Sequence, residues 1–177
     1  MSLGTKKLAF LGLLTALSVV MIILSGILDF NTLFLLAAAS YCVGIAFRES
    51  NIQTAAGFYV ASLILGFLLA PNKLYCITYA AMGVYILSSE FSYDMLVKVK
   101  YRSTRKILLW VIKYVIFNLM YIPALLFLPG LLYSGTISRE FIAGFLLIGQ
   151  AALLVYDLAY NSFQGVLWEK MRRHLKL

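Results

Sequence analysis

Residues 8–28 read LAFLGLLTALSVVMIILSGIL, a run of 21 residues without a charged side chain. An α-helix rises about 1.5 Å per residue, so about 20 apolar residues cross the roughly 30 Å of hydrocarbon in a bilayer. Lys6 and Lys7 precede the run, but it is longer than the apolar core of a cleavable signal peptide, which has about 7–15 residues. The stretch therefore predicts a membrane helix that is retained in the protein.

The composition of the whole chain agrees with a membrane environment. Of the 177 residues, 63% are hydrophobic and 12% are charged, whereas soluble domains average about 45–50% apolar and about 25% charged residues. A water-soluble fold of this composition would have too little polar surface to cover its core. We therefore expect lipid to surround much of the protein.

Five further apolar runs follow the first one. The third ends at Pro71-Asn72-Lys73, a strong turn signal, and the fourth is short and carries several Ser, Thr and Tyr residues. Residues 90–106 form the only hydrophilic stretch longer than a turn, which we expect to be a connection. The sequence thus predicts an all-α membrane protein, with six transmembrane helices in one bundle and a single domain. The expected spans are residues 8–28, 32–47, 52–70, 74–89, 107–128 and 139–160, the last with a helical extension to about residue 170.

The positions of Lys and Arg indicate the orientation of this bundle, because these residues are enriched in cytoplasmic connections. With six spans and the N-terminus inside, 12 of the 15 Lys and Arg residues lie inside, only Lys73 and Arg139 lie outside, and Lys113 lies within the fifth span. If the fourth run did not cross, the basic tail would fall on the outer side and contradict the rule. We therefore expect a cell-membrane (plasma-membrane) protein with both termini cytoplasmic. The net charge of +8 is explained without a nucleic-acid partner.

Two charged side chains lie inside the predicted spans. A charge in hydrocarbon costs about 2.5–3.5 kcal/mol on insertion scales, so each one is a candidate functional group. Lys113 lies about two turns from the cytoplasmic end of the fifth span, near enough to reach the headgroups, and Asp157 lies in the inner part of the sixth. The two either form an intramembrane ion pair, or Lys113 reaches the headgroups and Asp157 is hydrated. A proton or cation relay needs more than one such pair, and we find no second pair, which disfavours an ion-coupled transporter.

Polar and aromatic residues of the outward half suit a ligand pocket, since such pockets are mostly apolar with a few polar groups that fix orientation. An aromatic belt with loop charges would explain the same residues. Asn118 and Gln150, about 15 Å deep in their spans, either hydrogen-bond to each other across the bundle or line the floor of this pocket. The candidate substrate-binding residues are Asn72, Lys73, Tyr75, Tyr79, Asn118, Tyr121, Arg139 and Gln150.

The first helix carries a stripe of small residues formed by Ala9, Gly12 and Ala16. Small residues four positions apart let a second helix approach closely within lipid. The stripe therefore predicts a docking surface for a partner subunit, or a packing surface within the bundle.

Motifs for catalysis and metal binding are missing from the sequence. The single histidine, His174, lies in the basic tail, which excludes an HExxH zinc site and most catalytic triads within the membrane. The chain has no Walker A or GxSxG motif, and Cys42 and Cys76 lack the spacing of a metal or disulfide framework. We expect no enzymatic activity, no cofactor and no metal.

The chain resembles the substrate-binding S-component of an energy-coupling factor (ECF) vitamin transporter. The resemblance rests on the size, the six expected spans with both ends inside, the opening Lys6-Lys7-Leu8-Ala9 before a small-residue helix, and the basic tail. In that family an Ala-xxx-Ala motif on the first helix docks onto the shared transmembrane coupling subunit. Gly12 and Ala16 are the counterpart here, with glycine in place of the first alanine.

The resemblance implies a small-molecule site near the outer face, formed by helices four to six and the outward loops. It also implies a chain without ATPase activity of its own, which topples in the bilayer when bound to an ATPase-driven module. The expected function is therefore uptake of a small vitamin-like molecule together with such a module. The alternatives are a non-transporting structural or regulatory membrane protein, whose basic segments bind anionic lipids or a cytoplasmic partner, and a small self-contained transporter.

Overall fold

The computed structural model describes residues 4–97, 101–127, 139–168 and 170, and every regular element in these ranges is helical. Five of the helices are long and apolar enough to cross a membrane, as expected for an all-α membrane protein. The elements are α1 (Thr5–Ser25), the short turn η1 (Asp29–Asn31), α2 (Thr32–Glu49), α3 (Ile52–Leu69), α4 (Lys73–Leu96), α5 (Arg102–Phe127), α7 (Arg139–Ser162) and its π-helical continuation η2 (Phe163–Trp168).

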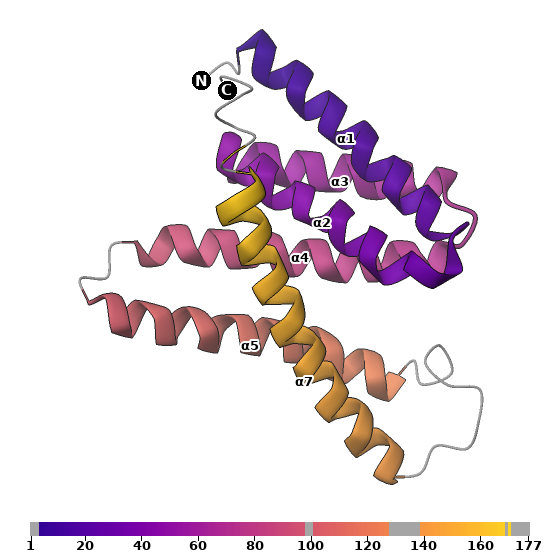
Figure 1. Ribbon diagram of the computed structural model, residues 1–177, viewed down its shortest axis with the longest axis vertical. Coiled ribbons are helices and arrows are strands. Elements are labelled where there is room, and N and C mark those ends of the chain that lie inside the picture. Colours follow the sequence, from indigo (N-terminus) through magenta and orange to yellow (C-terminus); the bar gives the residue numbers. More distant parts are fainter. Residues whose placement is uncertain (1–3, 98–100, 128–138, 169, 171–177) are drawn as a thin grey trace.

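Helices α2 and α4 lie at the centre of the arrangement. Helix α2 packs against α1, α3 and α4, and residues 39–46 are all buried. Helix α5 lies beside α4, and α7 crosses both of them obliquely (Figure 1). Among the α5 residues whose side chains are described, only Leu125 is buried, so most of this helix faces outward.

The beginning of α1 and the end of η2 lie together on one side of the bundle. The rings of Phe10 and Trp168 are 5.6 Å apart between centroids, and the indole N–H of Trp168 donates to Glu49 Oε1 at 3.3 Å. Lys7 Nζ donates to the carbonyl of Glu49 at 3.0 Å. The end of α2 is therefore part of the same region.

Helix α4 is the one long helix of the described chain that is not apolar enough by composition alone to be a candidate membrane span. It packs against α1, α2, α3 and α5, and Tyr79, Tyr85 and Glu90 are buried on it. A helix surrounded by protein can carry polar groups, because neighbouring helices supply the hydrogen bonds that lipid cannot.

The connection between α4 and α5 is much shorter than the hydrophilic stretch 90–106 suggested. Helix α4 continues to Leu96 and α5 begins at Arg102. Glu90, which we expected in a cytoplasmic connection, is a buried helical residue with 6% of its surface exposed. A charged residue at this position remains in the helix because Arg48 of α2 neutralises it, as described below.

Tyrosine rings packed on glycines allow three pairs of helices to approach closely. In each pair, an added Cβ on the glycine would overlap atoms of the tyrosine side chain. Small residues serve the same purpose in membrane helix interfaces generally. The pairs are Tyr59 on Gly83, Tyr160 on Gly44, and Tyr121 on Gly149.

Replacing Gly149 with alanine is expected to destabilise the protein, whereas Gly144→Ala on the same helix is not. The ring of Tyr121 occupies the space at Gly149, and its hydroxyl donates to the carbonyl of Phe145 at 2.7 Å, so the ring cannot move without losing that bond. At Gly144 nothing lies within 4 Å of an added Cβ, and alanine favours a helix over glycine by about 1 kcal/mol. Unfolding in detergent should show a loss of about 1–3 kcal/mol for Gly149→Ala; equal stability of the two variants would contradict the close packing.

Candidate functional site

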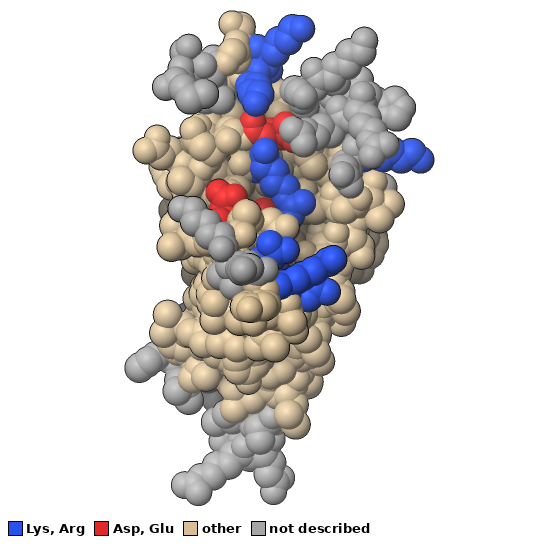
Figure 2. All heavy atoms as spheres, turned by 90° about the vertical axis from the view of Figure 1, so that its left-hand side faces the viewer, with Lys and Arg blue, Asp and Glu red and all other residues tan. Residues whose placement is uncertain are grey.

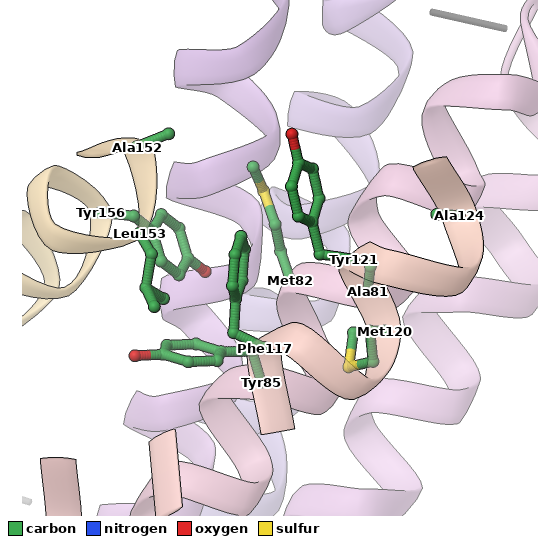
Figure 3. A pocket seen from close by; sticks show the side chains of 10 residues that line it. All are labelled: Ala81, Met82, Tyr85, Phe117, Met120, Tyr121, Ala124, Ala152, Leu153 and Tyr156. Atoms are coloured by element: carbon green, nitrogen blue, oxygen red, sulfur yellow. The ribbon is translucent and has the colours of Figure 1, made fainter. Parts of the chain in front are cut away.

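A cavity of about 210 Å³ lies between α4, α5 and α7. Figure 3 shows side chains of all three helices directed at this space. The walls are apolar and aromatic, with small alanines and two methionines among them, which is the usual makeup of a small-molecule site. The lining residues are Ala81, Met82 and Tyr85 of α4, Phe117, Met120, Tyr121 and Ala124 of α5, and Ala152, Leu153 and Tyr156 of α7.

The polar groups of the cavity are tyrosine hydroxyls that are already hydrogen-bonded to the protein. Tyr85 donates to Asp157 Oδ1 at 3.0 Å, and Tyr156 shares a 2.6 Å hydrogen bond with Ser40. The rings of Phe117 and Tyr121 are stacked, with centroids 5.0 Å apart. Because these hydroxyls are engaged with the protein, the surface that faces the cavity is apolar, and the cavity can hold a flat apolar molecule against aromatic rings.

Asp157 connects this cavity to a charged region nearer the ends of α2 and α4. Only 1% of its surface is exposed, and its Oδ1 accepts hydrogen bonds from Tyr85 and from Lys113 Nζ, the latter at 2.6 Å. Its Oδ2 accepts from Asn161 Nδ2 at 2.9 Å. The ion pair that the sequence suggested is thus present, and three donors surround the carboxylate. The alternative of a separate, hydrated Asp157 does not describe this arrangement.

A second ion pair joins the exposed Arg48 of α2 to the buried Glu90 of α4. Two hydrogen bonds connect the groups, from Nη2 to Oε1 at 2.6 Å and from Nε to Oε2 at 3.0 Å. Tyr160 donates a further hydrogen bond to Glu90 Oε1 at 2.5 Å. Our sequence argument that no second pair exists was therefore wrong. The available signal was spacing, because Glu90 continues the buried stripe of Tyr79, Gly83 and Ile86 at helical intervals.

The eight residues proposed to bind substrate are not gathered in one place. Asn72 and Lys73 act at helix ends: Asn72 Oδ1 accepts from the backbone N–H of Leu74 at 3.0 Å, and Lys73 Nζ donates to carbonyls at the end of α3, among them Ala70 at 3.0 Å. Such carbonyls have no partner within their own helix, which explains why a lysine nearby binds them.

The other candidates also have structural partners. Tyr79 is fully buried and its hydroxyl lies 2.6 Å from that of Ser62. Gln150 Nε2 donates to Asn118 Oδ1 at 2.8 Å, so these two side chains connect α5 to α7 as one of our two interpretations expected. Tyr75 is half-buried against the core. Among the candidates whose side chains are described, only Tyr121 lines the cavity.

Three of our expectations fall outside the described residues. These are the side chain of Arg139, the outward connection at residues 128–138 and the basic tail beyond Lys170.

The small-residue stripe of α1 faces away from the bundle. Ala9, Gly12 and Ala16 are all exposed, and nothing lies within 4 Å of a Cβ added to Gly12. The stripe therefore does not pack against another described part of this chain, and docking onto a partner subunit stays a prediction.

No protein-family model, curated protein or solved structure matches the chain.

Replacing Lys113 with methionine should destabilise the protein more than replacing Asp157 with asparagine. The first change leaves a buried carboxylate without its cation, which costs about 3–5 kcal/mol for buried pairs. The second leaves a lysine whose side chain is 13% exposed and can extend toward the headgroups. We expect the double variant to be more stable than Lys113→Met alone, measured by unfolding in detergent, with the exposed Lys6→Met as control. If the loss of stability in the double variant equalled the sum of the losses in the two single variants, the two side chains would not be coupled, which would contradict the ion pair.

Proposed function

We propose that this chain is the membrane-embedded substrate-binding subunit of a system for uptake of a small molecule. The observation that carries the proposal is the cavity between α4, α5 and α7. It lies among the last three helices, which is where the resemblance to ECF S-components leads us to expect a substrate site. Its apolar and aromatic walls are chemically suited to hold a ring compound.

The same proposal includes six membrane spans with both ends in the cytoplasm. Helix α4 has 24 residues, enough to cross the hydrocarbon, and its central position compensates for its lower hydropathy. The contact between Phe10 and Trp168 supports both ends on one side. Charged side chains gather on the face at the left of Figure 1, which Figure 2 views directly. By the positive-inside rule this face is cytoplasmic.

The dimensions of the cavity favour a compact substrate. Its volume of about 210 Å³ is below the roughly 300–1,000 Å³ of sites for drug-sized ligands. The stacked rings of Phe117 and Tyr121 offer a flat apolar surface. We therefore propose a small, planar, mostly uncharged heterocycle, the chemistry of the ring portion of a vitamin-like molecule.

Filling the cavity should abolish substrate binding without unfolding the protein. Ala152 lines the cavity, whereas Ala151, beside it on α7, does not. Leucine at position 152 places extra methyl groups where the ring would lie, and overpacking of this kind costs about 1–3 kcal/mol. We expect Ala152→Leu to weaken binding at least about tenfold and Ala151→Leu to leave it unchanged. The measurement is binding of water-soluble vitamins to purified protein without ATP, beside mass spectrometry of compounds that co-purify.

Two outcomes would contradict the proposal. A folded wild-type protein that retains no small molecule and binds none of a vitamin panel would favour the structural or regulatory alternative. Equal loss of binding in the Ala151→Leu and Ala152→Leu variants, with both proteins folded, would place the site elsewhere.

The exposed stripe of α1 is proposed to dock onto the coupling subunit. Gly12→Leu should prevent association with a membrane complex that contains ATPases, while substrate binding persists, because Gly12 is remote from the cavity lining. Gly57→Leu on α3 is the matched control, since Gly57 is also exposed and has nothing within 4 Å of an added Cβ. Association is measured by purification from native membranes and identification of the bound subunits. Retention of the complex by Gly12→Leu would overturn this part of the proposal.

The second ion pair is the reason to keep one other function in view. Arg48–Glu90 and Lys113–Asp157 give the helix bundle two carboxylates paired with basic groups, as an ion-coupled transporter that works alone would require. The two functions differ in liposomes that contain this chain as the sole protein. Accumulation of solute driven by a proton gradient would favour the self-contained transporter, whereas binding without uptake fits the subunit.

A further inference from the structure

A charged cleft of about 460 Å³ opens beside the two ion pairs, on the side of the bundle proposed to be cytoplasmic. Four helices contribute to its walls, so it is formed by the fold as a whole. The lining residues are Arg48 of α2, Ser89, Glu90 and Tyr93 of α4, Lys106, Leu109, Trp110 and Lys113 of α5, and Asp157, Tyr160 and Asn161 of α7.

The cleft has an excess of positive charge near its exposed edge. Glu90 is neutralised by Arg48 and Asp157 by Lys113. Lys106 is exposed and forms no ion pair within the described residues. The guanidinium of Arg105 lies 5.9 Å from the ring centroid of Tyr93, a residue of the cleft wall. Two basic groups are therefore available to an anion here.

The inner wall offers a further polar group. Ser89 belongs to this wall and is 3% exposed. The nearby carboxylate of Asp94 lines a neighbouring hollow rather than this cleft.

An apolar surface continues from the cleft along the outside of α5. Trp110 belongs to the cleft wall and is 40% exposed. Ile107 lies one turn before Trp110 and forms a strip with Val111 and Val115 at four-residue spacing; these three residues are 64%, 51% and 56% exposed. Tryptophan is enriched at the level of the headgroups, where one edge meets water and the other meets hydrocarbon. The cleft and the strip together match an amphiphile with an anionic head.

We propose that this cleft binds the headgroup of an anionic phospholipid of the cytoplasmic leaflet, whose acyl chains lie along Ile107, Val111 and Val115. Lys106 and Arg105 hold the phosphate, and Tyr93 supplies a hydroxyl group. Basic pockets between membrane helices on the cytoplasmic side recognise lipid headgroups in this way. A free phosphate would share the basic groups but leave the apolar strip unused. The inference rests on the orientation proposed above and not on the substrate cavity.

Lipid selectivity of the purified protein tests the inference. Native mass spectrometry with added dioleoyl phosphatidylglycerol or dioleoyl phosphatidylcholine should show retention of the anionic lipid in preference to the zwitterionic one. Lys106→Gln should weaken that retention about fivefold, the factor that corresponds to roughly 1 kcal/mol per basic residue near an anionic lipid surface. Lys6→Gln, which removes an exposed lysine outside the cleft, should have no effect.

Chain length and competition separate a lipid from a soluble anion. Dihexanoyl phosphatidylglycerol, which has the same head and short chains, should bind more weakly than the dioleoyl form. Excess inorganic phosphate should not displace the dioleoyl form. Equal retention of both headgroups, an equal effect of Lys6→Gln and Lys106→Gln, or displacement by phosphate alone would overturn the proposal. Substrate binding by the same samples is measured in parallel, so failure of the lipid site is distinguishable from failure of the proposed function.

Discussion

The carboxylate of Asp157 is the group on which the arrangement of the last three helices depends. It lies where lipid and water offer no compensation, and it accepts hydrogen bonds from Tyr85 of α4, Lys113 of α5 and Asn161 of its own helix. A buried charge is tolerated only when such donors surround it, so the position of α7 relative to α4 and α5 is constrained at this point. Two of these donors line different spaces: Tyr85 belongs to the wall of the apolar cavity, and Lys113 belongs to the wall of the charged cleft.

Helix α4 shows how a membrane bundle accommodates polar residues at its centre. The helix carries Tyr79, Tyr85 and Glu90 toward its neighbours, and each has a hydrogen-bond partner on a different helix, namely Ser62 of α3, Asp157 of α7 and Arg48 of α2. Hydropathy measures how well a segment tolerates lipid, and this segment meets protein on most sides. The polar residues of α4 lower its hydropathy, and the bundle tolerates them because neighbouring helices surround α4 and supply their hydrogen bonds.

The spacing of apolar runs was sufficient to locate every long helix, because length and hydropathy are properties of each segment alone. The contacts of Lys113 with Asp157 and of Asn118 with Gln150 were also accessible, since few polar groups inside a bundle leave few possible partners. The cavity could not be predicted from the sequence, because the alanine, leucine and methionine residues among its walls form no distinctive pattern. Asn72 and Lys73 resembled ligand-binding groups, but unpaired backbone groups at the nearest helix ends compete for them. Only the relative placement of α4, α5 and α7 reveals which side chains share a space.

The crossing of α7 over α5 is held near Gly149, by its contact with Tyr121 and by the adjacent hydrogen bond from Gln150 to Asn118, and again at the ion pair of Asp157. These positions are eight residues apart, or about 12 Å along a helix, and the α7 residues of the cavity lie between them. The cavity under this part of α7 is therefore bounded at both ends along the helix. Its length is set by the helix between the two contacts, and its depth by the side chains that project into it. Substitutions at Ala152, Leu153 and Tyr156 can therefore change the shape of the cavity while the contacts at Gly149 and Asp157 keep α7 in place.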